Sequence, residues 1–129
     1  MAMAWCFADE STPETALIQD RMASEAAVVP GHWFLEVANV LAMAEKRKRI
    51  LPDDAQQFLQ LLSLLDIQVD DEAARRAFDH ILPLARRHSL TSYDAAYLDL
   101  AIRRQLPLAS LDDDLRQAAV RLGLAVLGK

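Results

Sequence analysis

The sequence has little cysteine and glycine and no excess of positive charge. Cys6 is the only cysteine, so the chain has neither an internal disulfide nor a cysteine-rich zinc site. With three glycines it lacks a glycine-rich phosphate loop. A net charge of −5 and a pI near 5.1 exclude the basic footprint of a duplex-DNA-binding protein. Any nucleic-acid contact would have to use local basic patches or bound cations.

Long hydrophobic runs are absent as well. The apolar opening segment, residues 1–8, is short, lacks a basic flank and meets Asp9 and Glu10 directly. It therefore reads as neither a signal peptide nor a membrane span, and we expect a cytoplasmic protein without a membrane partner. The 129 residues are 53% hydrophobic, enough for one core. Because repeats, low-complexity tracts and linkers are also missing, we expect a single domain over residues 1–129.

The remaining pattern alternates amphipathic helices with short apolar strands. Strands are expected at residues 26–30, 67–69, 106–111 and 124–127. Helices are expected at residues 1–7, 11–24, 32–49, from 52 onward, and at 70–88, 91–105 and 112–122. This alternation predicts an α/β fold with a parallel sheet covered on both faces. The pattern starts with a helix, so no strand candidate leads into the first crossover.

Helical periodicity also predicts which side chains face the core. Val40 belongs to the apolar stripe of the helix at 32–49, and Leu61 to that of the next helix. Tyr93 and Tyr97 belong to the stripe of the helix at 91–105. The arginines at 103 and 104 are expected at the surface.

Three acidic residues stand beside apolar faces near helix starts. Glu36 lies in the first two turns of its helix, where His32 at i−4 and Asn39 at i+3 are within hydrogen-bonding reach. Asp94 is the third residue after Thr91, a position that fits a helix-capping box as well as a functional site. Asp112 follows a strand, where it could cap the next helix or belong to a site at the carboxyl ends of the strands.

Together these carboxylates favour a cation site. Clustered carboxylates repel one another, so a site that keeps several of them ionised generally holds a divalent cation. Oxygen ligands without a histidine or cysteine cluster favour Mg²⁺ or Mn²⁺ over zinc. The alternative is a plain α/β scaffold in which all three acids cap helices.

At these positions the sequence resembles the PIN-domain ribonucleases, and in particular the VapC toxins of bacterial toxin–antitoxin pairs. The likeness covers essentially the whole chain. Its most specific part is the Tyr-Asp-Ala-x-Tyr segment together with its spacing to a later Leu-Asp pair. The matching segments are residues 4–10, 30–41, 90–97 and 107–112.

The resemblance implies a three-layer α/β/α sandwich and a Mg²⁺-dependent endoribonuclease toxin of a type II toxin–antitoxin system. It implies Glu36, Asp94 and Asp112 as catalytic and metal-binding residues. Supporting candidates are Ser110, Asp114 and Asn39. The implied partners are an RNA substrate, a small antitoxin with a basic segment, and a second copy in a homodimer.

In the family, a short central strand ending in Asp-x-Ser precedes the first helix, and Met1 falls about where that segment would be. Four buried aliphatic side chains at roughly 1.5–3 kcal/mol each would give about 6–12 kcal/mol, comparable with the ~5–15 kcal/mol stability of a domain. We therefore expect a misassigned start or a trimmed chain; otherwise a neighbouring chain or a rearranged sheet covers the hole. Without the strand's aspartate, the alternative function is a non-catalytic PIN-like protein that only binds a partner.

Overall fold

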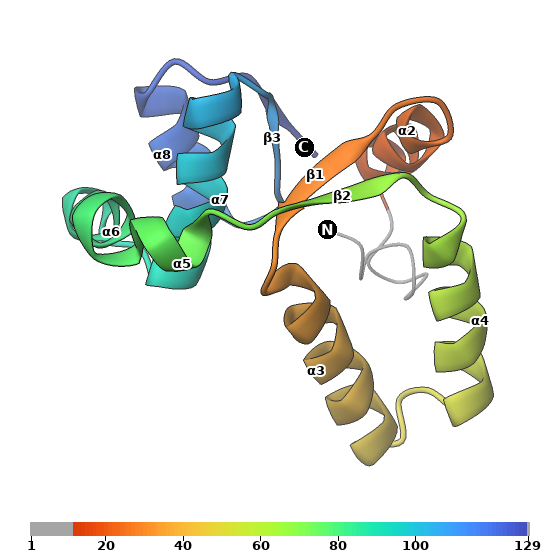
Figure 1. Ribbon diagram of the computed structural model, residues 1–129. Coiled ribbons are helices and arrows are strands. Elements are labelled where there is room, and N and C mark those ends of the chain that lie inside the picture. The colour runs from red at the N-terminus through yellow and green to blue at the C-terminus, as the bar shows by residue number, and fades with distance from the viewer. Residues whose placement is uncertain (1–11, 129) are drawn as a thin grey trace.

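A computed structural model of the chain describes residues 12–128. Helices and short strands alternate along these residues, as the sequence predicts (Figure 1). The first half contains α2 (Pro13–Met22), β1 (Ala27–Pro30), α3 (Trp33–Lys46), α4 (Pro52–Ser63) and β2 (Ile67–Asp70). The second half contains α5 (Ala73–Arg76), α6 (Leu82–His88), α7 (Ser92–Arg104), β3 (Leu108–Ala109), α8 (Asp113–Arg121) and β4 (Val126–Leu127). The helix expected at residues 1–7 lies outside the described residues.

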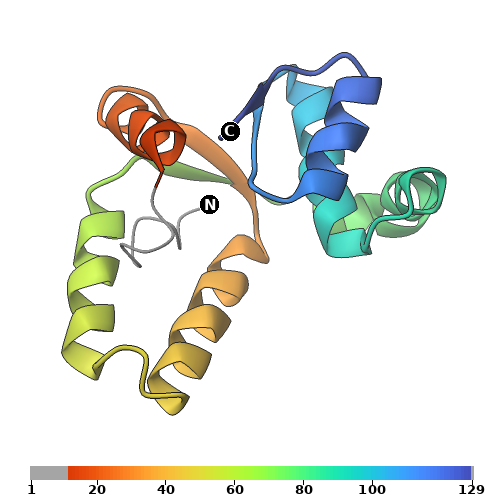
Figure 2. The same cartoon turned by 180° about the vertical axis from the view of Figure 1, so that it is seen from behind.

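All strand pairing in the described part is parallel, which confirms the α/β class. β1 pairs with β2 from Ala27↔Ile67 to Pro30↔Asp70, and β3 pairs with β4 from Leu108↔Val126 to Ala109↔Leu127. Within residues 12–128 the strands thus form two separate pairs, where the sequence analysis expected one sheet. The view from behind shows the two pairs on different parts of the molecule (Figure 2).

A groove of about 630 Å³ lies between β1 and β3, and residues of both strands line it. Ala27 donates its N–H to the carbonyl of Asp66 in the β2 segment at 2.8 Å. Because peptide groups alternate in direction along a parallel strand, those of Val28 point away from β2. On β3, the neighbours of Ala109 both bond the β4 segment, so the peptide groups of Ala109 point away from β4. On the groove side, the peptide groups of Val28 and Ala109 therefore form no hydrogen bonds with β2 or β4.

Local capping fixes the helix starts. Thr12 forms a capping box with Thr15 at the start of α2, and Pro13 occupies the first turn. Thr91 accepts the N–H of Asp94 at 3.1 Å at the start of α7. Asp112 does the same for the N–H of Leu115 at 3.1 Å at the start of α8. These side chains satisfy backbone donors that the first helical turn leaves open.

The segment expected as one helix at residues 70–88 is interrupted. Asp70 ends strand β2, and a π-helical stretch, Ala77–Ile81, separates α5 from α6. Pro83 follows this stretch and has no N–H to give to the carbonyl of Asp79, so a regular α-helix would lose a bond there. The wider π turn, closed by the N–H of Leu82 on the carbonyl of Ala77, directly precedes this proline.

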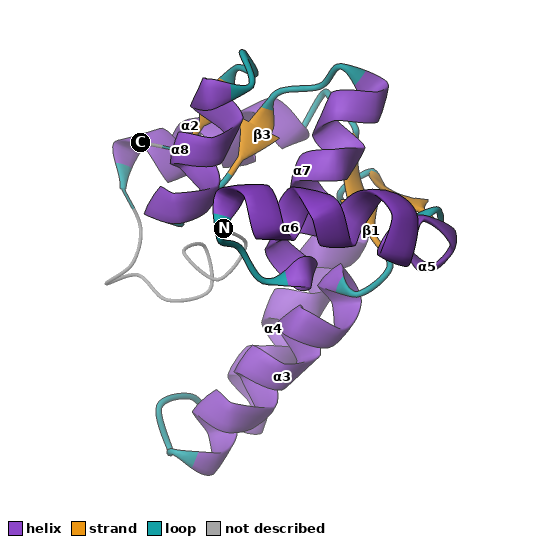
Figure 3. Ribbon diagram, turned by 90° about the vertical axis from the view of Figure 1, so that its left-hand side faces the viewer, coloured by secondary structure: helices purple, strands orange, loops and turns teal. Residues whose placement is uncertain are grey.

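Three apolar clusters hold the described residues together, and α7 contributes to two of them. Leu98 packs with residues of β3 and α8, while Ala95 packs under α6. The third cluster joins α3 to α4, which extend together away from the rest of the molecule (Figure 3). Three residues expected to face the core are instead exposed: Val40 (37%), Leu61 (59%) and Tyr93 (64%). Periodicity places a residue on a face of its helix, but only packing decides whether that face is covered.

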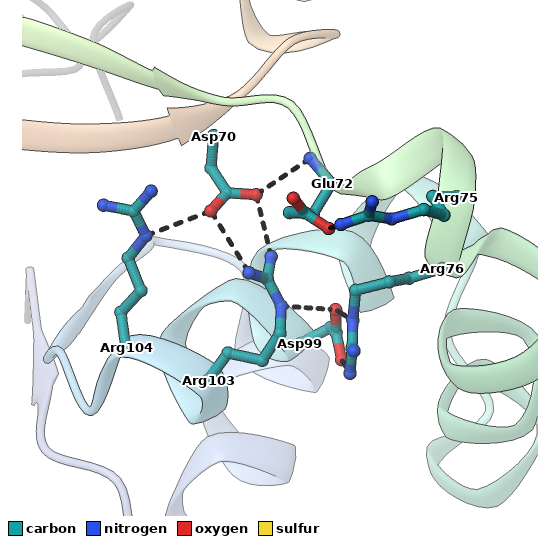
Figure 4. Close-up of polar contacts among 7 residues, drawn as sticks. All are labelled: Asp70, Glu72, Arg75, Arg76, Asp99, Arg103 and Arg104. Atoms are coloured by element: carbon teal, nitrogen blue, oxygen red, sulfur yellow. Dashed lines mark hydrogen bonds and ion pairs between the residues drawn. The ribbon is translucent and has the colours of Figure 1, made fainter.

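A cluster of ion pairs joins the end of β2 to α5 and α7 (Figure 4). Asp70, 3% exposed at its side chain, accepts hydrogen bonds from Arg103 at 2.8 Å and from Arg104 at 3.0 Å. Asp99, 7% exposed, binds Arg76 at 2.8 Å and Arg103 at 3.1 Å. Arg103 thus bridges two buried carboxylates, so the surface position expected for it from the sequence is wrong. We call these five residues the ion-pair cluster.

None of the helices described between residues 12 and 128 is long and apolar enough to cross a membrane.

Candidate functional site

The three acidic residues predicted from sequence come from segments that surround one end of the groove. Glu36 lies early in α3, which follows β1, and Asp112 follows β3. Asp94 lies in the first turn of α7, and α7 contacts both β1 and β3. The side chains of Glu36 and Asp94, together with Ser110, line the groove, whereas Asp112 does not. Strand ends and one helix start therefore bring residues that are far apart in sequence to one region.

Asp94 is the electrostatic centre of this region. Its carboxyl is partly buried, and this burial raises its pKa. The negative charges of Asp112 and then of Glu36 raise the pKa further. None of the three carboxylates forms an ion pair with lysine or arginine among residues 12–128. The Thr91 side chain and the nearby His32 oppose this rise, but no lysine or arginine among residues 12–128 pairs with Asp94.

Glu36 is held by two side chains. The hydroxyl of Tyr97 donates a hydrogen bond of 2.5 Å to its Oε1. His32 lies one turn before Glu36 in the chain, and its Nε2 is 3.4 Å from the same oxygen. His32 therefore lies near Glu36, as expected from the sequence, but the hydrogen bond of its Nε2 goes to the carbonyl of Tyr93 at 3.1 Å. Burial, and after it the bond to Glu36, raises the pKa of Tyr97, so its hydroxyl remains a donor.

Asp112 has a structural role that the structure makes explicit. Its side chain caps α8, as the capping interpretation of the sequence predicts. Its own N–H donates to the Ser110 hydroxyl at 3.1 Å, which fixes that hydroxyl at the edge of the groove. Arg116 donates to the carbonyls of Ser110 and Leu127 at 2.8 and 2.9 Å and holds the ends of β3 and β4 together. One carboxylate oxygen, Oδ1, serves the cap, and capping does not prevent the other from facing a ligand.

The other supporting candidates are not joined to the site. Asn39 and Asp114 are exposed, and neither makes a side-chain contact with the three acids within the described residues. Sequence reasoning placed Tyr97 in the core stripe but missed its hydroxyl contact with Glu36. The available signal was the pairing of two polar tips, Asp94 and Tyr97, at a spacing of three on one helix.

The comparisons with known proteins agree with the resemblance at the level of the family. The PIN domain matches residues 2–121, nearly the entire sequence. This chain belongs to the PIN domain family. PIN domains are generally metal-dependent nucleases and typically use divalent metals. Among curated proteins, no match to this chain was found.

The acidic residues of this PIN domain can be tested against the metal that the family implies. Within residues 12–128, no three or more His, Cys, Asp or Glu side chains lie close enough together to hold a metal ion. Mg²⁺, however, is usually bound through one or two carboxylates and keeps several of its waters. Glu36 and Asp94 line the same groove and supply such a pair; burial raises the pKa of Asp94, and the charges of Asp112 and Glu36 raise it further. The donor set thus fits a hard divalent cation.

Proposed function

We propose that this PIN domain is an endoribonuclease that cleaves RNA with a water molecule activated by Mg²⁺ or Mn²⁺. The observation that carries the proposal is Asp94: a groove-lining carboxylate whose pKa is raised first by burial and then by two further carboxylates, with no lysine or arginine partner among residues 12–128. A buried charge that the protein leaves unpaired is costly, and such perturbed groups gather at functional sites.

In this proposal each residue has a separate task. Asp94 and Glu36 would hold the cation from the groove, with Asp112 acting from its edge, directly or through water. The cation, when bound, supplies an activated water and stabilises charge on the phosphate. Ser110, which lines the groove, would position substrate or water beside the cation. The surrounding apolar walls, such as Val28 and Leu108, limit solvent around these groups.

We further propose that the chain acts as a VapC-type toxin of a type II toxin–antitoxin pair in the cytoplasm. The family membership supports a nuclease, and the net charge of −5 suits a basic partner. A small antitoxin with a basic segment would neutralise the acids around Asp94. Residues 1–129 would form one domain, and two copies would form the homodimer. Light scattering of the purified chain measures that last state directly.

The test of the nuclease proposal is RNA cleavage by the purified chain. Total cellular RNA is incubated with Mg²⁺, or with EDTA, and the fragments are quantified. Asp94→Asn should lower the cleavage rate about 100-fold or more, since the metal contributes several kcal/mol to transition-state stabilisation. Asp53→Asn, at an exposed aspartate in the first turn of α4, is the matched control and should leave the rate unchanged. Equal rates for wild type and Asp94→Asn would refute the mechanism.

A second candidate function is a non-catalytic PIN-like protein that only binds a partner. The absence of a three-acid metal group within residues 12–128 favours it. Isothermal titration with Mn²⁺ separates the two functions. Binding that Asp94→Asn abolishes supports the nuclease, whereas heat of binding to a partner protein without any Mn²⁺ binding supports the second candidate.

A further inference from the structure

The strongest link between α3 and α7 at the site is a single hydrogen bond. Tyr97 and Glu36 are separated by 61 residues in sequence, and their side chains meet at 2.5 Å. Tyr97 follows Asp94 by three residues on α7, so the two side chains lie close together on one face of that helix. The hydroxyl of Tyr97 therefore reaches from the element that carries Asp94 to the element that carries Glu36.

The ring of Tyr97 is well fixed. It packs against the apolar cluster formed by α7, β3 and α8. On its other side it meets the ring of His32 edge-to-face, with centroids 5.2 Å apart. A tyrosine held on both sides has little freedom, because two torsions define its position. The location of its hydroxyl is thus set by the body of the fold.

Glu36, in contrast, depends on its neighbours for orientation. Its side chain is 47% exposed, and an exposed glutamate samples several rotamers. His32 assists the tyrosine: its Nε2 lies 3.1 Å from the carbonyl of Tyr93 and 3.4 Å from Oε1 of Glu36. Both of these oxygens are acceptors, so this nitrogen carries a hydrogen. The Tyr97 hydroxyl is therefore the donor on Oε1, with the His32 ring beside it, and within residues 12–128 Oε2 has no partner.

We propose that Tyr97 is a positioning residue for the cation site: its hydroxyl fixes Glu36 Oε1 so that the free Oε2 is presented beside Asp94. This inference rests on the proposed metal-dependent function. Without the hydroxyl, Glu36 must lose rotamer freedom when the cation binds, and the affinity falls accordingly. Partners that orient metal ligands in this way typically contribute 10–100-fold to metal affinity or activity.

The experiment compares Mn²⁺ binding by isothermal titration for the wild-type chain and four variants: Tyr97→Phe, Tyr93→Phe, Glu36→Gln and the double variant with Glu36→Gln and Tyr97→Phe. Tyr97→Phe keeps the ring and removes only the hydroxyl, and it should weaken Mn²⁺ binding about 10-fold or more. Tyr93→Phe is the matched control on the same helix, because the Tyr93 ring is exposed and its hydroxyl has no partner among residues 12–128. It should bind Mn²⁺ like the wild type.

A double variant separates positioning from a general structural effect. If Tyr97 acts through Glu36, Tyr97→Phe adds no further loss in a Glu36→Gln background. An additional loss of the same size in that background would overturn the inference, as would wild-type affinity in Tyr97→Phe alone. After either of these two results, the proposed function still holds if the wild type binds Mn²⁺ and Asp94→Asn does not. Absence of Mn²⁺ binding by the wild type overturns the proposed function and this inference with it.

Discussion

Asp70 is buried and Asp94 is partly buried, and the charges around these two aspartates are opposite in sign. Around Asp70 the fold supplies Arg103 and Arg104; the hydrogen bond from Arg103 leads the causes that lower its pKa from 3.8 to about 2, against the effect of burial. Around Asp94 the fold supplies Asp112 and Glu36, and burial together with these charges raises its pKa. The same side chain is thus stabilised as an anion in one place and destabilised in the other.

The presence or absence of an arginine partner distinguishes the structural carboxylates from the candidate functional ones. In the ion-pair cluster every carboxylate has a guanidinium partner, and Asp99 shows the same balance. Burial alone would raise the pKa of Asp99, but the hydrogen bonds from Arg76 and Arg103 outweigh it and lower the pKa. A carboxylate paired in this way holds elements together. Asp94 has no guanidinium partner among residues 12–128 and lies near two further carboxylates, so it leaves room for a cation from solution.

The largest effect is expected from removing Asp70, the aspartate that is paired with arginines. Asp70→Ala leaves Arg104 without its partner and takes one of two carboxylates from Arg103. Removing one member of a buried ion pair costs about 3–5 kcal/mol, so urea unfolding should show a loss of that size. Arg104→Ala is the control: its side chain is 43% exposed, and the expected loss is about 1 kcal/mol or less. Equal losses would mean that the cluster acts through packing.

Acid should reduce the stability that Asp70 contributes to the fold, within a defined pH range. The folded-state pKa of Asp70 lies below its ordinary value, so the stability it contributes is present above pH 3.8 and is lost as the pH falls toward about 2. A difference of this size corresponds to roughly 2 kcal/mol. The measurement is urea unfolding between pH 5 and pH 2, compared with Asp70→Asn. A variant with the same acid sensitivity as the wild type would place the titrating group elsewhere.

A smaller effect of opposite sign is expected for Asp94, which has no arginine or lysine partner among residues 12–128. Because the pKa of Asp94 is raised in the folded state, its ionisation destabilises the metal-free protein as the pH rises from its ordinary value of 3.8 through the folded-state value. Asp94→Asn should therefore stabilise the metal-free chain at neutral pH. A gain of ~1 kcal/mol would raise Tm by about 4 °C. The measurement is thermal unfolding in EDTA at pH 7, and a lower Tm for the variant would contradict the assignment.

The change in Tm on addition of Mn²⁺ tests whether Asp94 and Asp70 have different roles. A ligand that binds only the folded state raises its stability. The wild type should gain Tm with Mn²⁺, while Asp94→Asn, which removes the central charge, should gain none. The same scan on Asp70→Asn should retain the Mn²⁺ response, because the ion-pair cluster is separate from the groove-lining acids. Loss of the response in Asp70→Asn would show that the two carboxylate groups are not independent.

Much of the fold could be predicted from local signals. Thr91 and Asp112 marked two helix starts correctly, because a cap depends on residues three or four positions apart. The strands expected at 26–30 and 67–69 correspond to β1 and β2, each within one residue at its ends, because short apolar runs of this kind favour buried strands. The three acids of the candidate site were chosen on similar grounds, from residue type and position in a helix or after a strand.

The sequence by itself determined the α/β alternation, the helix caps and an oxygen-only set of acids, since each depends on chemistry within a few neighbouring residues. The tertiary structure decided which acids are paired with arginine and which are not. Asp70 and Arg103 are 33 residues apart, and Tyr97 and Glu36 are 61 apart. Contacts over such distances depend on how whole elements pack. For this reason identical aspartates, each near a helix start or strand end, became an ion-pair anchor in one place and a candidate cation ligand in the other.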